Sequence, residues 1–124
     1  MTFTAACIQL QSTIDVAQNI ATVEHLVREA ARAGAHYVQT PEMTNIVERN
    51  RASLEKAIQP ERTDPAVRSF GALAAELGIV LHIGSLALRA EDGKIANRAL
   101  IFGRDGRLDG DGRRLWRGTL RATF

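Results

Sequence analysis

The sequence is poor in residues that crosslink small secreted domains or bind metals. It contains one cysteine, Cys7, which excludes an internal disulfide framework and a multi-cysteine zinc site and agrees with a reducing compartment. His25 and His36 are isolated and lack the spacing of metal ligands. His82 lies three residues before Ser85 but inside an apolar strand and without the context of a nucleophile elbow, so we expect it to be a core residue. We therefore expect neither a metal nor a cofactor.

Long apolar runs are also missing. No window approaches the roughly 18 uninterrupted apolar residues of a membrane span. The N-terminus lacks a basic segment followed by an apolar signal region. The formal net charge of +2 is too small to imply an acidic partner. These absences predict a cytoplasmic location, with no membrane and no nucleic acid as partners.

The composition is that of a soluble globular domain. The 124 residues suffice for one domain at most, and a chain of this size buries about two-thirds of its unfolded surface. A hydrophobic share of 45% with 24% charged residues is ordinary for such a protein. The order of the secondary-structure signals therefore decides the fold class.

The first part of the chain has the pattern of a βαβ unit. The apolar run Phe3 to Leu10 predicts a buried strand in which Cys7 is a small core residue. Asp15 can cap the following helix, and Gly34 ends it. The buried side of this helix is a stripe at helical spacing, made of Ile20, Val23, Val27, Ala30 and Ala31. A right-handed crossover to a second strand before Pro41 implies parallel strands.

A second helix and a hairpin follow a polar stretch that predicts only a weak helix around Ala52 to Ile58. Asp64-Pro65 predicts a helix start and Gly78 its end, with a buried stripe of Val67, Phe70, Leu73, Ala74 and Leu77. Ile79 to Ile83 predicts a third strand. The remaining signals are strands over Ser85 to Ala90 and Ile95 to Phe102, the turn Glu91-Asp92-Gly93-Lys94 between them, and a turn at Arg104-Asp105-Gly106.

The stretch Ala35 to Thr44 carries the candidate for chemistry. Its apolar run ends at Pro41, which lacks the N–H of a central strand, so the backbone should leave the sheet there. Glu42 then lies at the carboxyl end of a strand, where open α/β folds bind ligands. From this stretch alone, both a catalytic carboxylate and a solvated loop glutamate remain open.

Four segments carry a resemblance in their order and spacing. They are Ala6-Cys7-Ile8-Gln9-Leu10, the strand from Gly34 to Glu42, Ile83-Gly84-Ser85, and Ala96-Asn97-Arg98-Ala99-Leu100 leading into Gly103-Arg104-Asp105-Gly106. Over about Phe3 to Leu108 the chain resembles the N-terminal part of the nitrilase, or carbon–nitrogen hydrolase, superfamily. The closer likeness is to its amidase branch, which includes ω-amidases and deaminated glutathione amidases. The resemblance implies an α/β fold, the N-terminal portion of an αββα sandwich, with β-α-β-α-β followed by a hairpin.

The resemblance also implies a mechanism. Members of the superfamily use a Glu-Lys-Cys triad, in which the cysteine attacks an amide or nitrile carbon and the glutamate acts as general base. The lysine stabilises the tetrahedral intermediate. Glu42 matches the general base by position, and complete relatives act on small linear amides.

The other two triad members have no match in this sequence. Lys56 lies in the polar stretch and Lys94 in the hairpin turn, and neither has the context of the family's lysine. Cys7 belongs to the first strand and does not match the nucleophile. We therefore expect residues 1–108 to be a partial carbon–nitrogen hydrolase domain, encoded by a truncated gene and inactive as this chain.

Residues 109–124 do not match the family pattern and predict a poorly ordered tail. Arginines crowd the last part of the chain at Arg104, Arg107, Arg113, Arg114, Arg117 and Arg121. Contact with nucleic acid through this tail is a weaker alternative, because Asp109 and Asp111 are interleaved and no recognition fold is present.

A sheet without its second layer would expose apolar surface. We therefore expect self-association or aggregation. The alternative to an inherited hydrolase function is a non-catalytic remnant or interaction module that associates through this exposed sheet.

Overall fold

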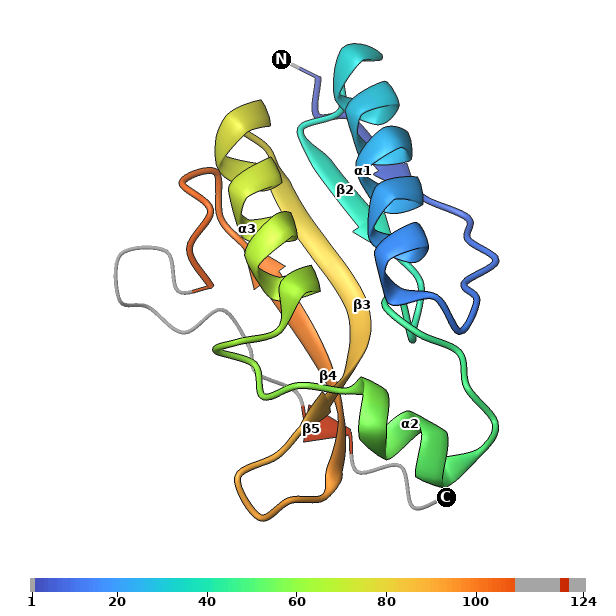
Figure 1. The fold of residues 1–124 in the computed structure, drawn as a ribbon. Coiled ribbons are helices and arrows are strands. Elements are labelled where there is room, and N and C mark those ends of the chain that lie inside the picture. Colours follow the sequence, from blue (N-terminus) through green and yellow to red (C-terminus); the bar gives the residue numbers. More distant parts are fainter. Residues whose placement is uncertain (1, 109–118, 121–124) are drawn as a thin grey trace.

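A computed structural model describes residues 2–108 and 119–120 (Figure 1). The elements in chain order are β1 (Ala5–Cys7), α1 (Val16–Arg32), β2 (Tyr37–Thr40), α2 (Arg51–Ala57), α3 (Pro65–Leu77), β3 (Val80–Arg89), β4 (Ile95–Phe102) and β5 (Thr119–Leu120). The expected α/β order is confirmed, and the weak helix expected in the polar stretch is α2.

The five strands form one sheet in the order β1-β2-β3-β4-β5. The first three strands are parallel, as the two helical crossovers predicted. β4 returns antiparallel to β3 through the predicted hairpin, and β5 pairs antiparallel with β4. The carboxyl ends of β1 and β2 therefore lie at one edge of the sheet, where Pro41 and Glu42 follow.

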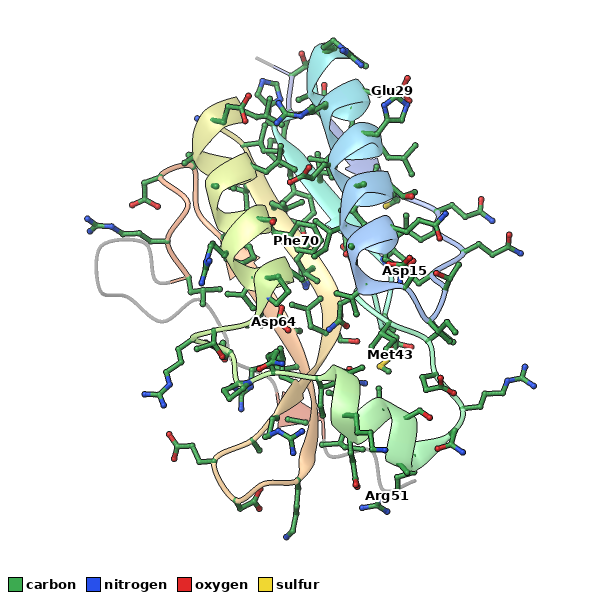
Figure 2. The ribbon with its side chains drawn as sticks, viewed as in Figure 1. Asp15, Glu29, Met43, Arg51, Asp64 and Phe70 are labelled. Carbon is green, nitrogen blue, oxygen red and sulfur yellow. The ribbon has the colours of Figure 1, made fainter. Side chains whose placement is uncertain are left out.

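The helices α1 and α3 lie side by side on one face of the sheet (Figure 1). Their apolar stripes and the facing strand residues form the main core, and Phe70 of α3 lies between the two helices (Figure 2). The most buried residues of this main core include Val23, Val27, Val38, Phe70, Leu73, Leu81, Ile83, Leu100 and Phe102. An exposed ion pair of Arg28 with Glu76, at 2.7 and 2.9 Å, also joins the helices.

The helix ends follow the local chemistry of the sequence. The carboxylate of Asp15 accepts the N–H of Gln18 at the start of α1. Asp64 does the same for two amides at the start of α3, where Pro65 is the first helical residue. Gly78 ends α3 with a φ of 62°, a left-handed conformation that glycine adopts without strain.

β3 differs from the expectation, which ended one strand at Ile83 and began another at Ser85. It is one continuous strand whose register against β4 shifts between Ile83 and Leu86. A bulge of this kind bends a strand without ending it. Gly84 therefore marks an irregularity within the strand.

A second apolar cluster lies where α2 meets the hairpin end of the sheet. Its buried members are Ile46, Leu54, Ile58 and Ala87, with Val16, Met43 and Ile95 packed against them. Met43 lies between the end of β2 and α2 in Figure 2. This cluster fixes the segment that follows β2 against the sheet.

The side chains of Cys7, Gln39 and His82 lie in register on the face opposite α1 and α3. They alternate with Val38 and Leu81, which point into the core. Cys7 is exposed, so the prediction that it is a core residue is wrong. The error arises because β1 is an edge strand and only its alternate residues face the helices.

The predicted tail, residues 109–124, falls almost entirely outside the described residues. Its described part is β5, which pairs Thr119 with Arg98 and Leu120 with Asn97. The poor order expected for the rest stays a prediction. In the described part of the chain, no helix has the length and apolar character needed to cross a membrane.

Candidate functional site

Glu42 is exposed and follows directly on the carboxyl end of β2. The strand ends at Thr40 and the chain leaves the sheet at Pro41, as the sequence predicted. Across residues 2–108 and 119–120, Glu42 has no hydrogen bond or ion pair through its side chain. The carboxylate is therefore available to an external group, on a backbone that is held in place.

The turn from Pro41 to Thr44 is closed by its own hydroxyl groups. The Thr44 hydroxyl donates to the Pro41 carbonyl oxygen at 2.7 Å and lies 2.8 Å from the Thr40 hydroxyl. Met43, between Glu42 and Thr44, has a φ of 51°, which is uncommon for a residue with a side chain. The turn thus has one defined shape.

Neighbouring β3 anchors this turn. Ser85 accepts the Met43 N–H on its hydroxyl oxygen and the Thr44 N–H on its carbonyl oxygen, both at 2.9 Å. A Cβ atom added at Gly84 would lie 2.6 Å from the carbonyl carbon and oxygen of Pro41. Glycine at this position therefore permits the close approach of β3 to the turn.

Two asparagines fix the segment after the turn. Asn45 is buried and bonds through both side-chain atoms to the main chain of Ala87 in β3. Its carbonyl oxygen accepts a hydrogen bond from the Asn19 side chain in α1 at 2.8 Å. Asn19 also binds Thr13, so the loop before α1 joins the same network.

The structure does not bring the other reactive groups of the sequence to Glu42. Cys7 lies in β1 on the open face of the sheet. Lys56 is in the last turn of α2, and Lys94 pairs with Asp92 in the hairpin turn at 3.4 Å. Glu42 is thus the one sequence-predicted site residue at this edge within the described part of the chain.

His82 and Ser85, three residues apart, do not form a nucleophile and base pair. The His82 Nδ1 lies 2.6 Å from the Tyr37 hydroxyl, on the open face of the sheet. Burial lowers the pKa of His82 and raises the pKa of Tyr37. His82 is half-buried, so the sequence-based interpretation of it as a core residue is wrong: β3 is an internal strand, and its alternate residues Leu81 and Ile83 face the helices instead.

The described residues contain no group of three or more histidine, cysteine, aspartate or glutamate side chains that could hold a metal ion. The sequence reasoning missed the anchoring role of Ser85, Thr44 and Asn45. The signals available were Thr44-Asn45 directly after the turn and Gly84-Ser85 after an apolar run. Neither signal indicates which residue the side chain bonds to.

Comparison with known proteins matches this chain to one family model. Residues 4–118 match the model of the carbon-nitrogen hydrolase family, so the match runs past Leu108, where the sequence placed the end of the partial domain. That boundary stays a prediction.

Characterised relatives include amidases. The chain is 35% identical over 88 residues to the deaminated glutathione amidase of Mus musculus, which covers 71% of this chain and 27% of that protein. It is 28% identical over 106 residues to a hydrolase of Schizosaccharomyces pombe, covering 86% of this chain and 33% of the hydrolase. The chain therefore spans about a quarter to a third of the curated relatives it matches.

Solved structures agree on the fold. The NitFhit protein of C. elegans is similar with a TM-score of 0.80 at 18% identity, covering 99% of this chain and 30% of that one. A carbon-nitrogen hydrolase from Helicobacter pylori is similar with a TM-score of 0.73 at 21% identity, covering 87% of this chain and 38% of that one. The α/β arrangement expected from the resemblance is confirmed.

Proposed function

This chain belongs to the carbon–nitrogen hydrolase family, and on that premise we propose that it is part of an amidohydrolase in which Glu42 is the general base. One observation carries the proposal. Glu42 is exposed at the carboxyl end of β2, on a turn that β3 holds through Ser85. An exposed carboxylate on a fixed backbone suits proton transfer better than a mobile loop residue does.

The proposed chemistry is hydrolysis of small linear amides by a Glu-Lys-Cys triad. A thiol is mostly protonated near neutral pH, so its attack on an amide carbon needs a nearby base, which is the role of Glu42. A lysine would stabilise the negative charge that develops on the amide oxygen. Two of the relatives are deaminated glutathione amidases, which supports an amide as the substrate class.

We propose that the 124-residue chain alone is inactive, because Cys7, Lys56 and Lys94 lie in the wrong contexts to complete the triad. Cys7 is on the edge strand, and both lysines lie outside the turn that carries Glu42. An assay of ammonia release from an ω-amide should give no signal above buffer. Activity that Glu42→Gln abolishes would contradict this part of the proposal.

The test of Glu42 uses a chimera in which this chain replaces its matching segment in the mouse deaminated glutathione amidase. We expect amide hydrolysis by the chimera, and a loss of about 10²- to 10⁴-fold in kcat for Glu42→Gln, the range typical of a general base. Glu91→Gln, in the exposed hairpin turn, is the matched control and should leave kcat unchanged. A Glu42→Gln chimera that folds and keeps kcat within a few-fold would refute the assignment.

A second proposal concerns partners: the open face of the sheet binds a second copy of this chain. The paired positions on this face that lie away from the hairpin carry no charged side chain, being Ala5, Cys7, Tyr37, Gln39, Val80, His82 and Ile101. Two copies therefore meet there without repulsion between like charges. The exposed and half-exposed apolar residues among them supply the surface to bury.

Sedimentation velocity tests this contact. We expect the wild-type chain to sediment as a dimer or larger species and Ile101→Lys to sediment as a monomer. Gln18→Lys, on an exposed position of α1, adds the same charge elsewhere and should leave the association intact. A wild-type chain that stays monomeric in the same buffer would rule the contact out.

The cytoplasmic location and the truncated gene stay predictions.

A further inference from the structure

Ser85 is buried, with 4% of its surface exposed, and three hydrogen bonds join it to the turn that carries Glu42. Its hydroxyl accepts the Met43 N–H at 2.9 Å, its carbonyl accepts the Thr44 N–H at 2.9 Å, and its N–H donates to Pro41 at 3.4 Å. The last two bonds involve only the Ser85 main chain. The bond to Met43 is the one that depends on the serine side chain.

The side-chain bond from Ser85 stabilises an unfavourable backbone conformation at Met43. Its left-handed conformation, with a φ of 51°, costs a residue with a Cβ atom about 1–2 kcal/mol. The Ser85 hydroxyl offsets part of this cost by accepting an N–H that points away from the β2 ladder. Without the hydroxyl, the Met43 N–H would be half-buried and without a partner.

The bulge in β3 explains why Ser85 can reach the turn. Ile83 pairs with Leu100 and Leu86 pairs with Arg98, so the register skips Ser85 on the side of β4. Gly84 lets the two backbones approach at the same point. The Thr44 hydroxyl closes the turn onto Pro41 and Thr40, the Thr40 hydroxyl also accepts the Gly84 N–H at 3.3 Å, and the Ser12 hydroxyl donates to the Thr44 carbonyl oxygen at 3.0 Å. None of these bonds involves the Met43 N–H.

We propose that Ser85 is a positioning residue for Glu42. The proposal rests on the proposed function of Glu42 as general base, and it assigns the group that fixes where that carboxylate points. A general base must lie within hydrogen-bond reach of the proton that it takes. Because a misplacement of about 1 Å can lower a rate by about 10²-fold, the orientation of the turn is part of the chemistry.

The experiment follows the turn by NMR in the full chain, as wild type, Ser85→Ala and Ser85→Thr. In the wild type we expect amide order parameters of about 0.85 at Glu42 and Met43, and slow amide exchange at Met43. Ser85→Ala should lower these order parameters below about 0.6 and speed Met43 exchange by at least about 10-fold. Ser85→Thr keeps the hydroxyl and should restore both values.

The amides of Val23 and Val27 in α1 report on the whole fold and should change little in any variant. Unchanged order and exchange at Met43 in Ser85→Ala would overturn the positioning role. If Ser85→Ala does not fold, the wild type decides: a Met43 amide that exchanges as fast as in an unfolded peptide overturns the proposal, and a protected one supports it. These measurements need no substrate, so a chimera that is insensitive to Glu42→Gln would refute the general base while leaving this result standing.

Discussion

The side-chain amide of Asn45 pairs with the main chain of Ala87 as a strand residue would. Its Nδ2 donates to the Ala87 carbonyl oxygen and its Oδ1 accepts the Ala87 N–H, both at 2.9 Å. β2 ends at Thr40, so these groups of β3 would otherwise lack a partner on that edge. One side chain therefore extends the sheet edge and fixes the segment after Glu42.

Replacing Asn45 by alanine should destabilise the chain. The substitution leaves two buried main-chain groups of Ala87 unpaired, at about 1–3 kcal/mol each. We expect urea unfolding to show a loss of about 2–6 kcal/mol in the free energy of unfolding. Gln11→Ala, at an exposed position, is the control and should change it by less than about 0.5 kcal/mol. A loss as small as the control's would show that the two bonds contribute nothing.

Alanine at Gly84 should disrupt the approach of β3 to the Glu42 turn. The added Cβ would lie 2.6 Å from main-chain atoms of Pro41, which cannot move aside as a side chain would. We expect a loss of about 1–3 kcal/mol, as for other overpacked sites, and altered amide shifts at Glu42 and Met43. Gly103→Ala is the matched control, since the nearest atom to its added Cβ is an Asp105 side-chain oxygen at 3.2 Å, farther away than the Pro41 atoms are from a Cβ at Gly84. Equal melting temperatures for the two variants would argue against this contact.

Most of the fold could be predicted from the sequence because its signals are local. Asp15, Asp64-Pro65 and Gly78 act within one helical turn, and the structure confirms all three as helix ends. The continuity of β3 could not be predicted, because Gly84 resembles a strand break when seen alone. Its role is set by Pro41, which lies far away in the sequence.

In the candidate site, too, the local features could be predicted from the sequence and the long-range contacts could not. Pro41 beside an apolar run was enough to place Glu42 at a strand end, because proline lacks the N–H that a central strand needs at that position. The anchors of the turn were missed, since Ser85 and Ala87 lie 42 residues from Met43 and Asn45. A hydrogen bond across that separation depends on the strand pairing, which the sequence determines only as a whole.

Asp64 should make the stability of the chain depend on pH. It is 3% exposed, and burial raises the pKa of its carboxyl even though the Ala66 and Val67 amides oppose that shift. The folded state therefore holds the proton more tightly than the unfolded state. This contribution to stability is complete below the unfolded pKa of about 4 and is lost as pH rises through the raised folded pKa.

Asp64→Asn keeps a cap oxygen for α3 but cannot ionise. Relative to wild type, we expect this variant to gain stability as pH rises from about 4 to 7, measured by urea unfolding at each pH. Asp15→Asn makes the same change at the exposed cap of α1 and is the matched control for the loss of a cap carboxylate. A difference between Asp64→Asn and wild type that stays constant with pH would contradict the burial effect.

His82 should make stability depend on pH in the opposite sense to Asp64, and in a higher pH range. Burial lowers the pKa of its imidazole, so the folded state binds the proton less tightly than the unfolded state, whose pKa is about 6.5. The stability contribution is complete above that value and is lost as pH falls through the lowered folded pKa. We expect wild type to lose stability between about pH 7 and 5, and His82→Gln to lose less. Equal slopes for wild type and His82→Gln would contradict the prediction.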